Sequence, residues 1–179
     1  MTLIRFPLVL CLLLLFTGCS LFRPAPPDPA AAGFRMVPGV PFRLQEERDD
    51  CGPAALASLL AHRGREIPVA DIRQAVYSPA LGGTLLPDME NFARRQGFVT
   101  RSGRGQAQLL RQTIDAGQPV VVPIQAGSWG VSRPHFLVVY GYDDQHFLVH
   151  AGTDAARLLT VAEFLPRWEK MGRLYLHLE

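Results

Sequence analysis

The spacing of the apolar residues changes near Pro119, and this change constrains the fold more than any other feature of the sequence. Before it, apolar residues recur at the three- and four-residue intervals typical of helices. These intervals predict helices over residues 51–63, 69–76, 84–96 with Thr84 as cap, and 109–116. After it, runs typical of strands fall at residues 119–124, 135–140, 146–149, 157–159 and 174–178.

Three smaller signals complete this pattern. Residues 98–101 predict a short early strand, and Gly82 and Gly83 predict a flexible loop. Thr160 and Glu163 form a capping-box pattern that predicts a last short helix, which Pro166 should bend or shorten. Helices followed by an antiparallel sheet indicate the α+β class.

The first 18 residues predict a secretory signal. Arg5 precedes an apolar run from Leu8 to Phe16, which is too short for a transmembrane helix of about 20 apolar residues. The segment LFTGC, ending at Cys19, resembles the lipobox of bacterial lipoproteins, which implies lipidation of Cys19. Ser20 implies, by the same resemblance, an outer-membrane location facing the periplasm. The alternatives are a signal peptide cut elsewhere and an uncut anchor.

The remaining chain predicts one domain on a tether. Residues 19–39 begin with the lipidated cysteine and are rich in Pro and Ala, as an extended tether is. Residues 40–179 suffice for a single core, and the whole chain is 48% hydrophobic and 19% charged. A net charge of +2 without a basic stripe predicts no nucleic-acid partner.

Cysteine usage singles out Cys51. Of the three cysteines, Cys11 leaves with the signal, Cys19 takes the lipid, and Cys51 has no partner for an internal disulfide. A buried cysteine that acts only as a small hydrophobe is the alternative. We expect Cys51 at the N-terminus of an amphipathic helix, where the helix dipole lowers a thiol's pKa. Gly52 leaves room beside it, and we expect Asp50 to cap the helix.

A nucleophilic thiol needs a base within hydrogen-bond reach, and five histidines are candidates. His135 opens an apolar strand directly after a loop, where scaffolds present catalytic groups. His150 ends the predicted partner strand and lies near it across the hairpin. The spacing leaves open whether His135 is a base or a structural residue. No His/Cys cluster has ligand spacing, so we expect no metal and no cofactor.

Two motifs together resemble a known family. Gln45 is followed by the segment CGPAAL at Cys51, and the segment HFLVVYGYD begins at His135. This pairing resembles the bacteriocin-processing, double-glycine-leader cysteine peptidases of the papain-like clan, in a stand-alone lipoprotein branch. The resemblance runs from about Pro41 to the C-terminus. It implies a papain-like fold, in which a helical half with the nucleophile at a helix N-terminus packs on a C-terminal antiparallel sheet.

The resemblance also implies roles for individual residues. Cys51 would be the nucleophile, His135 the general base, and Gln45 would donate its side-chain amide to the oxyanion hole beside the Cys51 N–H. The family usually has Asp or Asn at the end of the second strand to orient the histidine, and this chain has Ala151 there. Asp154, reaching round the turn, is one candidate replacement, and a backbone carbonyl or a water molecule is another. A one-residue shift of the register would instead put His150 at this position.

The expected activity is hydrolysis of a peptide or amide bond through a thioester. The expected partners are a peptide or protein substrate, the membrane through the lipid, and a periplasmic or secretion-system protein. Trp129, Gly82 and Gly83 are candidate residues of the substrate cleft. The alternatives are a transamidase or acyltransferase on the same scaffold, a degenerate binding module, and a purely structural lipoprotein; Ala151 favours the binding module.

Overall fold

The computed structural model describes residues 33–127 and 133–179, and residues 33–179 form one compact unit. The predicted signal, Cys19, most of the tether and Trp129 lie outside the described residues. Strand β1 (Arg35–Met36) already belongs to this unit, so the unit begins before residue 40. No helix in the described part of the chain is long and apolar enough to cross a bilayer.

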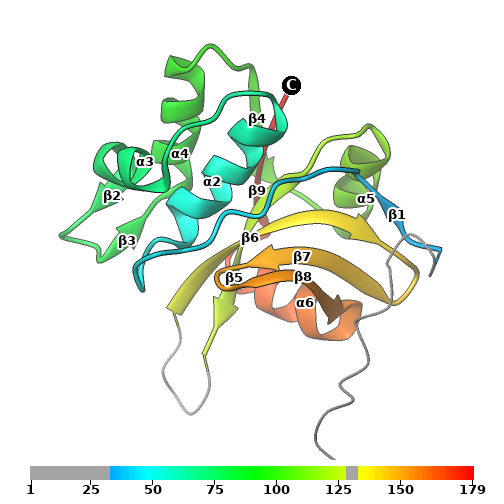
Figure 1. The fold of residues 1–179 in the computed structure, drawn as a ribbon. Helices are drawn as coiled ribbons and strands as arrows, with labels where there is room; N and C mark the ends of the chain where they lie inside the picture. Colours follow the sequence, from blue (N-terminus) through cyan, green and yellow to red (C-terminus); the bar gives the residue numbers. More distant parts are fainter. Residues whose placement is uncertain (1–32, 128–132) are drawn as a thin grey trace, which may run out of the picture. The chain divides into compact units, whose positions relative to one another are not determined.

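An antiparallel sheet forms the centre of the described unit (Figure 1). Its strand order is β4-β9-β5-β6-β7-β8, and β1 adds to β6. The strands are β4 (Thr100–Arg104), β5 (Val120–Ala126), β6 (Arg133–Tyr142), β7 (His146–Ala151), β8 (Asp154–Thr160) and β9 (Leu174–Leu178). The predicted strands are therefore found, most of them a few residues longer than expected.

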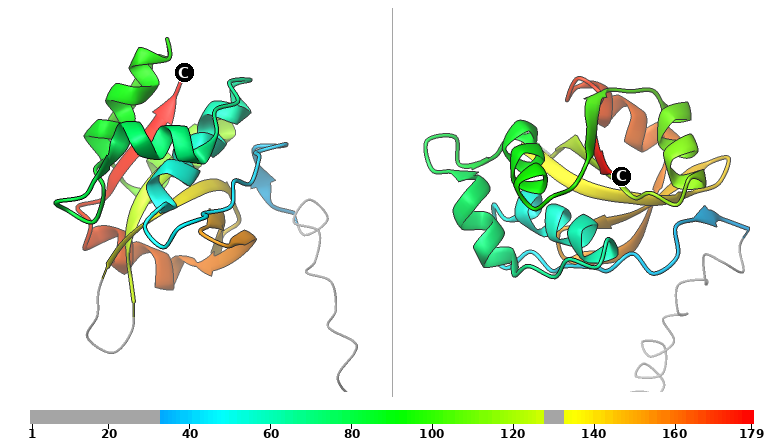
Figure 2. Two further views of the ribbon diagram at one scale, coloured as in Figure 1. Left: turned by 60° about the vertical axis from the view of Figure 1, so that its left-hand side comes forward. Right: turned by 90° about the horizontal axis from the view of Figure 1, so that it is seen from above.

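Helices cover both faces of this sheet (Figures 1 and 2). The helices α2 (Cys51–His62), α3 (Val69–Val76) and α4 (Leu86–Arg95) pack together on one side, and α2 lies against β6. Helix α6 (Val161–Glu169) packs on the other side against β5, and α5 (Ala107–Asp115) packs near β6 and β1. The α+β prediction, with a helical half on a C-terminal antiparallel sheet, is confirmed.

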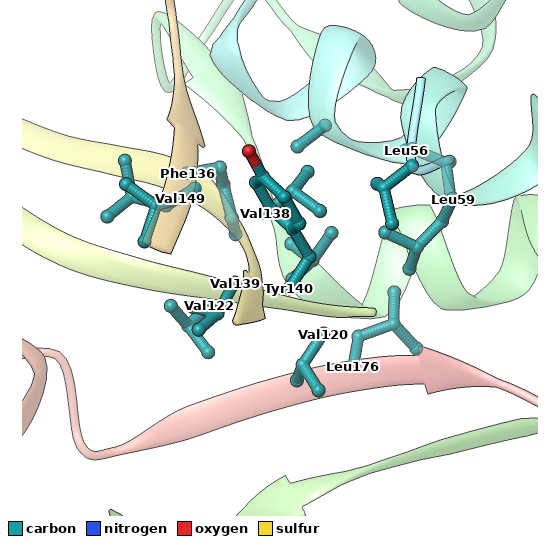
Figure 3. Close-up of a cluster of buried hydrophobic side chains, with 14 of the residues drawn as sticks. Leu56, Leu59, Val120, Val122, Phe136, Val138, Val139, Tyr140, Val149 and Leu176 are labelled. Atoms are coloured by element: carbon teal, nitrogen blue, oxygen red, sulfur yellow. The ribbon is translucent and has the colours of Figure 1, made fainter. Parts of the chain in front are cut away.

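Burial on both faces explains the composition of the central elements. Every residue from Phe136 to Tyr142 on β6 is buried, because helices lie above and below this strand. Figure 3 shows Leu56 and Leu59 of α2 facing the sheet around Val120 and Leu176. Residues 52–60 of α2 are all buried, so the prediction of an amphipathic helix there is wrong.

Three local predictions differ from the structure. The expected loop around Gly82 is a hairpin of β2 (Tyr77–Ser78) and β3 (Gly83–Thr84). Thr84 belongs to this hairpin instead of capping α4, whose N-cap is Leu85. Helix α6 has the predicted capping box but continues through Pro166.

Candidate active site

Cys51 is the first residue of α2 and is half-buried. A hydrogen bond from the backbone of Phe136 acts to lower the pKa of the Cys51 thiol. Phe136 is the residue that follows His135 on β6. The first turn of α2 contributes through the backbone of Gly52. The packing of α2 on β6 therefore brings the nucleophile and the histidine strand together.

The protonation of Cys51 differs from the sequence expectation. Burial raises the pKa of the Cys51 thiol, and the negative charge of Asp49 adds to this effect. Hydrogen bonds from the backbone of Phe136 and Gly52 favour the thiolate but do not outweigh burial. The expected depression of the pKa by the helix N-terminus is therefore wrong for the free protein, in which the neutral thiol is favoured.

Asp50 precedes the nucleophile but does not cap the helix through its side chain, contrary to expectation. Its carboxylate is 2% exposed, pairs with the guanidinium of Arg73, and accepts a hydrogen bond from the Glu47 N–H at 3.0 Å. The carboxylate charge next to Cys51 is thus neutralised by α3. This pair fixes the turn from which α2 begins.

The β2–β3 hairpin completes the support of the helix start. A Cβ on Gly52 would lie 2.8 Å from the Cβ of Thr84, so only glycine fits between Cys51 and the hairpin. Arg73 stacks over the ring of Tyr77 at 3.9 Å, and Tyr77 pairs with Thr84 in the hairpin. The same arginine therefore connects the hairpin to Asp50.

His135 lies near the beginning of β6 and is half-buried. Burial lowers the pKa of its imidazole, and the charge of Arg157 lowers it further, while Asp154 acts in the opposite direction. Among the described residues no hydrogen bond to the His135 ring is found. A neutral imidazole is the form that accepts a proton from a thiol.

The register of β6 and β7 locates the position of the family's orienting residue. Ala151 pairs with Leu137, and opposite residues in an antiparallel pair point to the same face of the sheet. His135, two residues before Leu137, shares that face, so Ala151 lies diagonal to it. Asp154 is exposed and pairs with Arg157 at 3.5 Å, and its role as the orienting residue stays a prediction.

Gln45, for which the resemblance implies an oxyanion-hole role, has its side chain and backbone held by neighbouring segments. Its Nε2 donates to the backbone carbonyls of Glu47 at 2.9 Å and Arg48 at 2.8 Å. Its backbone N–H donates to the carbonyl of Gly152 at 3.3 Å. The amide hydrogens of Gln45 are thus occupied, and its oxyanion-hole role stays a prediction.

His150 is buried, and both nitrogens of its ring are hydrogen-bonded, so it is not available as a second base. Its Nε2 lies 3.0 Å from the carbonyl of Val40, and its Nδ1 accepts the N–H of Ala156 at 3.2 Å. These two bonds define a neutral ring with its hydrogen on Nε2. Burial lowers the pKa of His150, which also favours the neutral form. His150 therefore ties the segment before Gln45 to β8.

A cleft of about 770 Å³ contains both Cys51 and His135. Gly82 and Gly83, predicted from sequence as cleft residues, lie in its wall together with the exposed side chains of Leu81 and Leu85. A second hollow of about 790 Å³ at the start of α5 contains none of the predicted catalytic residues, so we place the chemistry in the first.

The sequence did not reveal four contributors to this site: Arg73, Thr84, Phe136 and Gly152. Each acts through a contact between distant segments. Phe136 stands in the motif that begins at His135, but its contact with Cys51 cannot be read from that motif. Of the residues that support Cys51, only its neighbours Asp50 and Gly52 could be singled out from the sequence, as an acid and a glycine that flank the cysteine.

Comparison with known proteins gives one family. Residues 39–174 match the model of the Peptidase C39 family. The peptidase domain of Streptococcus ComA, a bifunctional ABC transporter involved in quorum sensing, is 25% identical with a TM-score of 0.65, covering 77% of this chain and 98% of that one. No curated protein matches this chain.

Two further solved structures share the fold. A putative C39-like peptidase from Bacillus anthracis is 17% identical with a TM-score of 0.66, over 80% of this chain and 96% of that chain. A double-glycine-motif protease from an AMS/PCAT transporter, solved with its leader peptide, is 19% identical with a TM-score of 0.63, over 78% and 91%. The chain therefore belongs to the Peptidase C39 family, and its compact unit is a cysteine peptidase domain with a papain-like fold.

Proposed function

We propose that this protein hydrolyses a peptide or related amide bond through a thioester at Cys51, with His135 as the general base. The observation that carries the proposal is the presence of both residues in one cleft, where the Cys51 thiol meets the backbone next to His135. Cys51 is a free, half-buried thiol, and a thiol that shares a site with a base is the arrangement that nucleophilic catalysis requires.

The proposed reaction has two stages. The sulfur of Cys51 attacks the substrate carbonyl while its proton passes to His135, and His135 returns that proton to the amine as the C–N bond breaks. His135 then removes a proton from water, which attacks the thioester and releases the carboxylic acid and the free thiol. No cofactor takes part in either stage.

The directions of the two pKa shifts determine when the proton moves. The raised pKa of Cys51 and the lowered pKa of His135 favour a neutral thiol beside a neutral imidazole in the free protein. We therefore propose that the proton passes from Cys51 to His135 during attack. For the oxyanion we propose the Cys51 N–H and the Gln45 amide, whose Nε2 donates to the carbonyls of Glu47 and Arg48 in the free protein.

The test is cleavage of a complex peptide mixture by the full-length protein, with new termini identified by mass spectrometry. We expect new termini with the wild-type protein and none with Cys51→Ala or His135→Ala. A full set of products from Cys51→Ala would exclude the thioester mechanism.

A binding module is the second candidate, because Ala151 cannot orient His135. It predicts that peptides bind, that no new termini form, and that Cys51→Ala keeps its biological activity. A transferase predicts that a labelled amine added to the mixture enters the products at the expense of hydrolysis.

For the substrate and the location we propose a peptide ligand and a lipid anchor at Cys19, in the outer membrane facing the periplasm. The structural neighbour solved with its leader peptide supports a peptide as the class of substrate. Incorporation of a labelled fatty acid that Cys19→Ser abolishes is the expected result for the anchor. Labelling that persists in Cys19→Ser would contradict it.

A further inference from the structure

The orientation of the Gln45 amide is fixed by its neighbours. A carbonyl oxygen only accepts hydrogen bonds, so the carbonyls of Glu47 and Arg48 must meet the NH₂ end of the side chain. The amide oxygen Oε1 therefore points away from them. A flipped amide would place oxygen against two carbonyl oxygens, which is unfavourable.

Oε1 lies against the same point as the His135 ring. A Cβ built on Gly152 has three nearest atoms: Gln45 Oε1 at 2.9 Å, His135 Cε1 at 3.2 Å and His135 Nε2 at 3.4 Å. Gly152 has a φ of +59°, which favours glycine, and its carbonyl accepts the N–H of Gln45. Gln45 Oε1 and the Nε2 edge of His135 thus both border the space that a side chain at position 152 would fill.

Position 151 carries no side chain that can orient His135 through a hydrogen bond. Ala151 stands on the face of His135 where an Asp or Asn would accept the hydrogen of Nε2, and a methyl group accepts nothing. Gln45 Oε1 is a side-chain acceptor that borders the same space beside Gly152 as the Nε2 edge of the ring.

We propose that Gln45 is a positioning residue for His135, with its Oε1 accepting the Nε2 hydrogen when substrate is bound. The inference rests on the proposed peptidase mechanism. Nδ1 then carries no hydrogen and is the nitrogen that takes the proton of Cys51. In the described structure the two side chains approach without a direct hydrogen bond, and catalytic bonds often shorten only in the substrate complex.

Alkylation of Cys51 by iodoacetamide separates this role from the oxyanion role. The reaction attacks a saturated carbon and forms no oxyanion, so loss of an oxyanion donor leaves its rate unchanged. We expect Gln45→Met in the full-length protein to lower the alkylation rate at pH 7 roughly tenfold, a part of what a general base contributes. We also expect Ala151→Asn to restore the rate in the Gln45→Met background, because it installs a new acceptor.

An unchanged alkylation profile in Gln45→Met, with peptide cleavage lost, would overturn the proposal and leave the oxyanion role. His135→Ala separates this result from failure of the mechanism itself. If His135→Ala also leaves the profile unchanged, the peptidase mechanism fails; if it alone changes the profile, only the role of Gln45 fails.

A second measurement covers the case in which Gln45→Met does not fold. The ¹⁵N chemical shifts of His135 in the wild-type protein with a bound substrate analogue report its tautomer. The proposal predicts hydrogen on Nε2. Hydrogen on Nδ1 in the neutral ring would overturn it.

Discussion

The two halves of the candidate active site are held in different ways. The start of α2 is fixed by contacts that reach Cys51 from three segments: a buried ion pair of Asp50 with Arg73, the Thr84 side chain over Gly52, and the backbone of Phe136. On the other side, His135 packs beside Gly152, and no hydrogen bond of its ring is found among residues 33–127 and 133–179. Cys51 is thus held by contacts from several segments, whereas His135 is held by packing alone.

This difference suggests where the chain tolerates change. A residue held by several independent contacts moves little when one contact weakens. A steric clash at the residue itself disturbs all of its contacts at once. A residue held by packing alone responds to any new hydrogen bond. The predictions below test the two halves in these terms, from the largest expected effect to the smallest.

The largest effect is expected from Gly52→Ala. The new Cβ meets the Cβ of Thr84 at 2.8 Å, so the start of α2 or the hairpin must shift. Because a displacement of about 1 Å at a reacting group costs on the order of 100-fold in rate, we expect a loss of that size in peptide cleavage. Thr84→Gly in the same background removes the collision and should restore most of the rate.

The matched control for this collision is Gly83→Ala, whose Cβ meets nothing within 4 Å. We expect Gly83→Ala to leave the thermal unfolding midpoint and the alkylation rate of Cys51 near the wild-type values. A fall in the alkylation rate of Cys51 that is smaller in Gly52→Ala than in Gly83→Ala would show that contact with Thr84 does not fix the start of α2.

The ion pair beneath Cys51 should be asymmetric. Arg73→Met leaves the carboxylate of Asp50, whose side chain is 3% exposed, buried without its partner, at a cost of about 3 kcal/mol in the free energy of unfolding. Asp50→Asn should cost less, because the Arg73 side chain is 28% exposed and reaches water. Urea denaturation measures both, and equal losses would contradict this assignment of burial.

The weaker half should respond to an added hydrogen bond. We expect Ala151→Asn to raise the alkylation rate of Cys51 at pH 7 about fivefold, since one net hydrogen bond contributes about 1 kcal/mol. Ala151→Leu has a similar size and no acceptor, and should not raise the rate. An increase in the alkylation rate with both variants would mean that the size of the side chain at position 151, and not a new hydrogen bond, determines how His135 is held.

The smallest effect concerns pH. The folded-state pKa of His150 is lowered from 6.5 by burial, so the unfolded chain binds the proton more readily. The stability contributed by neutral His150 is present above pH 6.5 and is lost as the pH falls below it. His150→Gln should flatten this decline, although His135 and His177 contribute in the same direction. A steeper decline in the variant would contradict the assignment.

The sequence predicted the fold well where the signal was local. Apolar spacing located α2, β5 and β6, and the capping box located α6, because these signals lie within single elements. The hairpin at Gly82 was missed because its two strands are too short to show a period.

The site was predicted less completely. Cys51, His135 and Gln45 were named from two motifs. The packing of α2 on β6 places Cys51 and His135 in one cleft, and Gln45 and His135 lie beside Gly152. The pKa of Cys51 was expected in the wrong direction, because burial depends on the whole fold whereas the helix N-terminus is visible in the sequence. The support from Arg73 and Thr84 depends on tertiary contacts that no spacing encodes.

The central claim is that Cys51 and His135 form a working pair, and the pH dependence of Cys51 alkylation tests it most directly. The account predicts two rises in rate: one below pH 6.5 as His135 loses its proton, and one above neutral pH as the thiol ionises, with a plateau between them. His135→Ala should remove the first rise and the plateau, and His62→Ala, at the far end of α2, should keep both. A single rise that follows an ordinary thiol and is the same in His135→Ala would contradict the account.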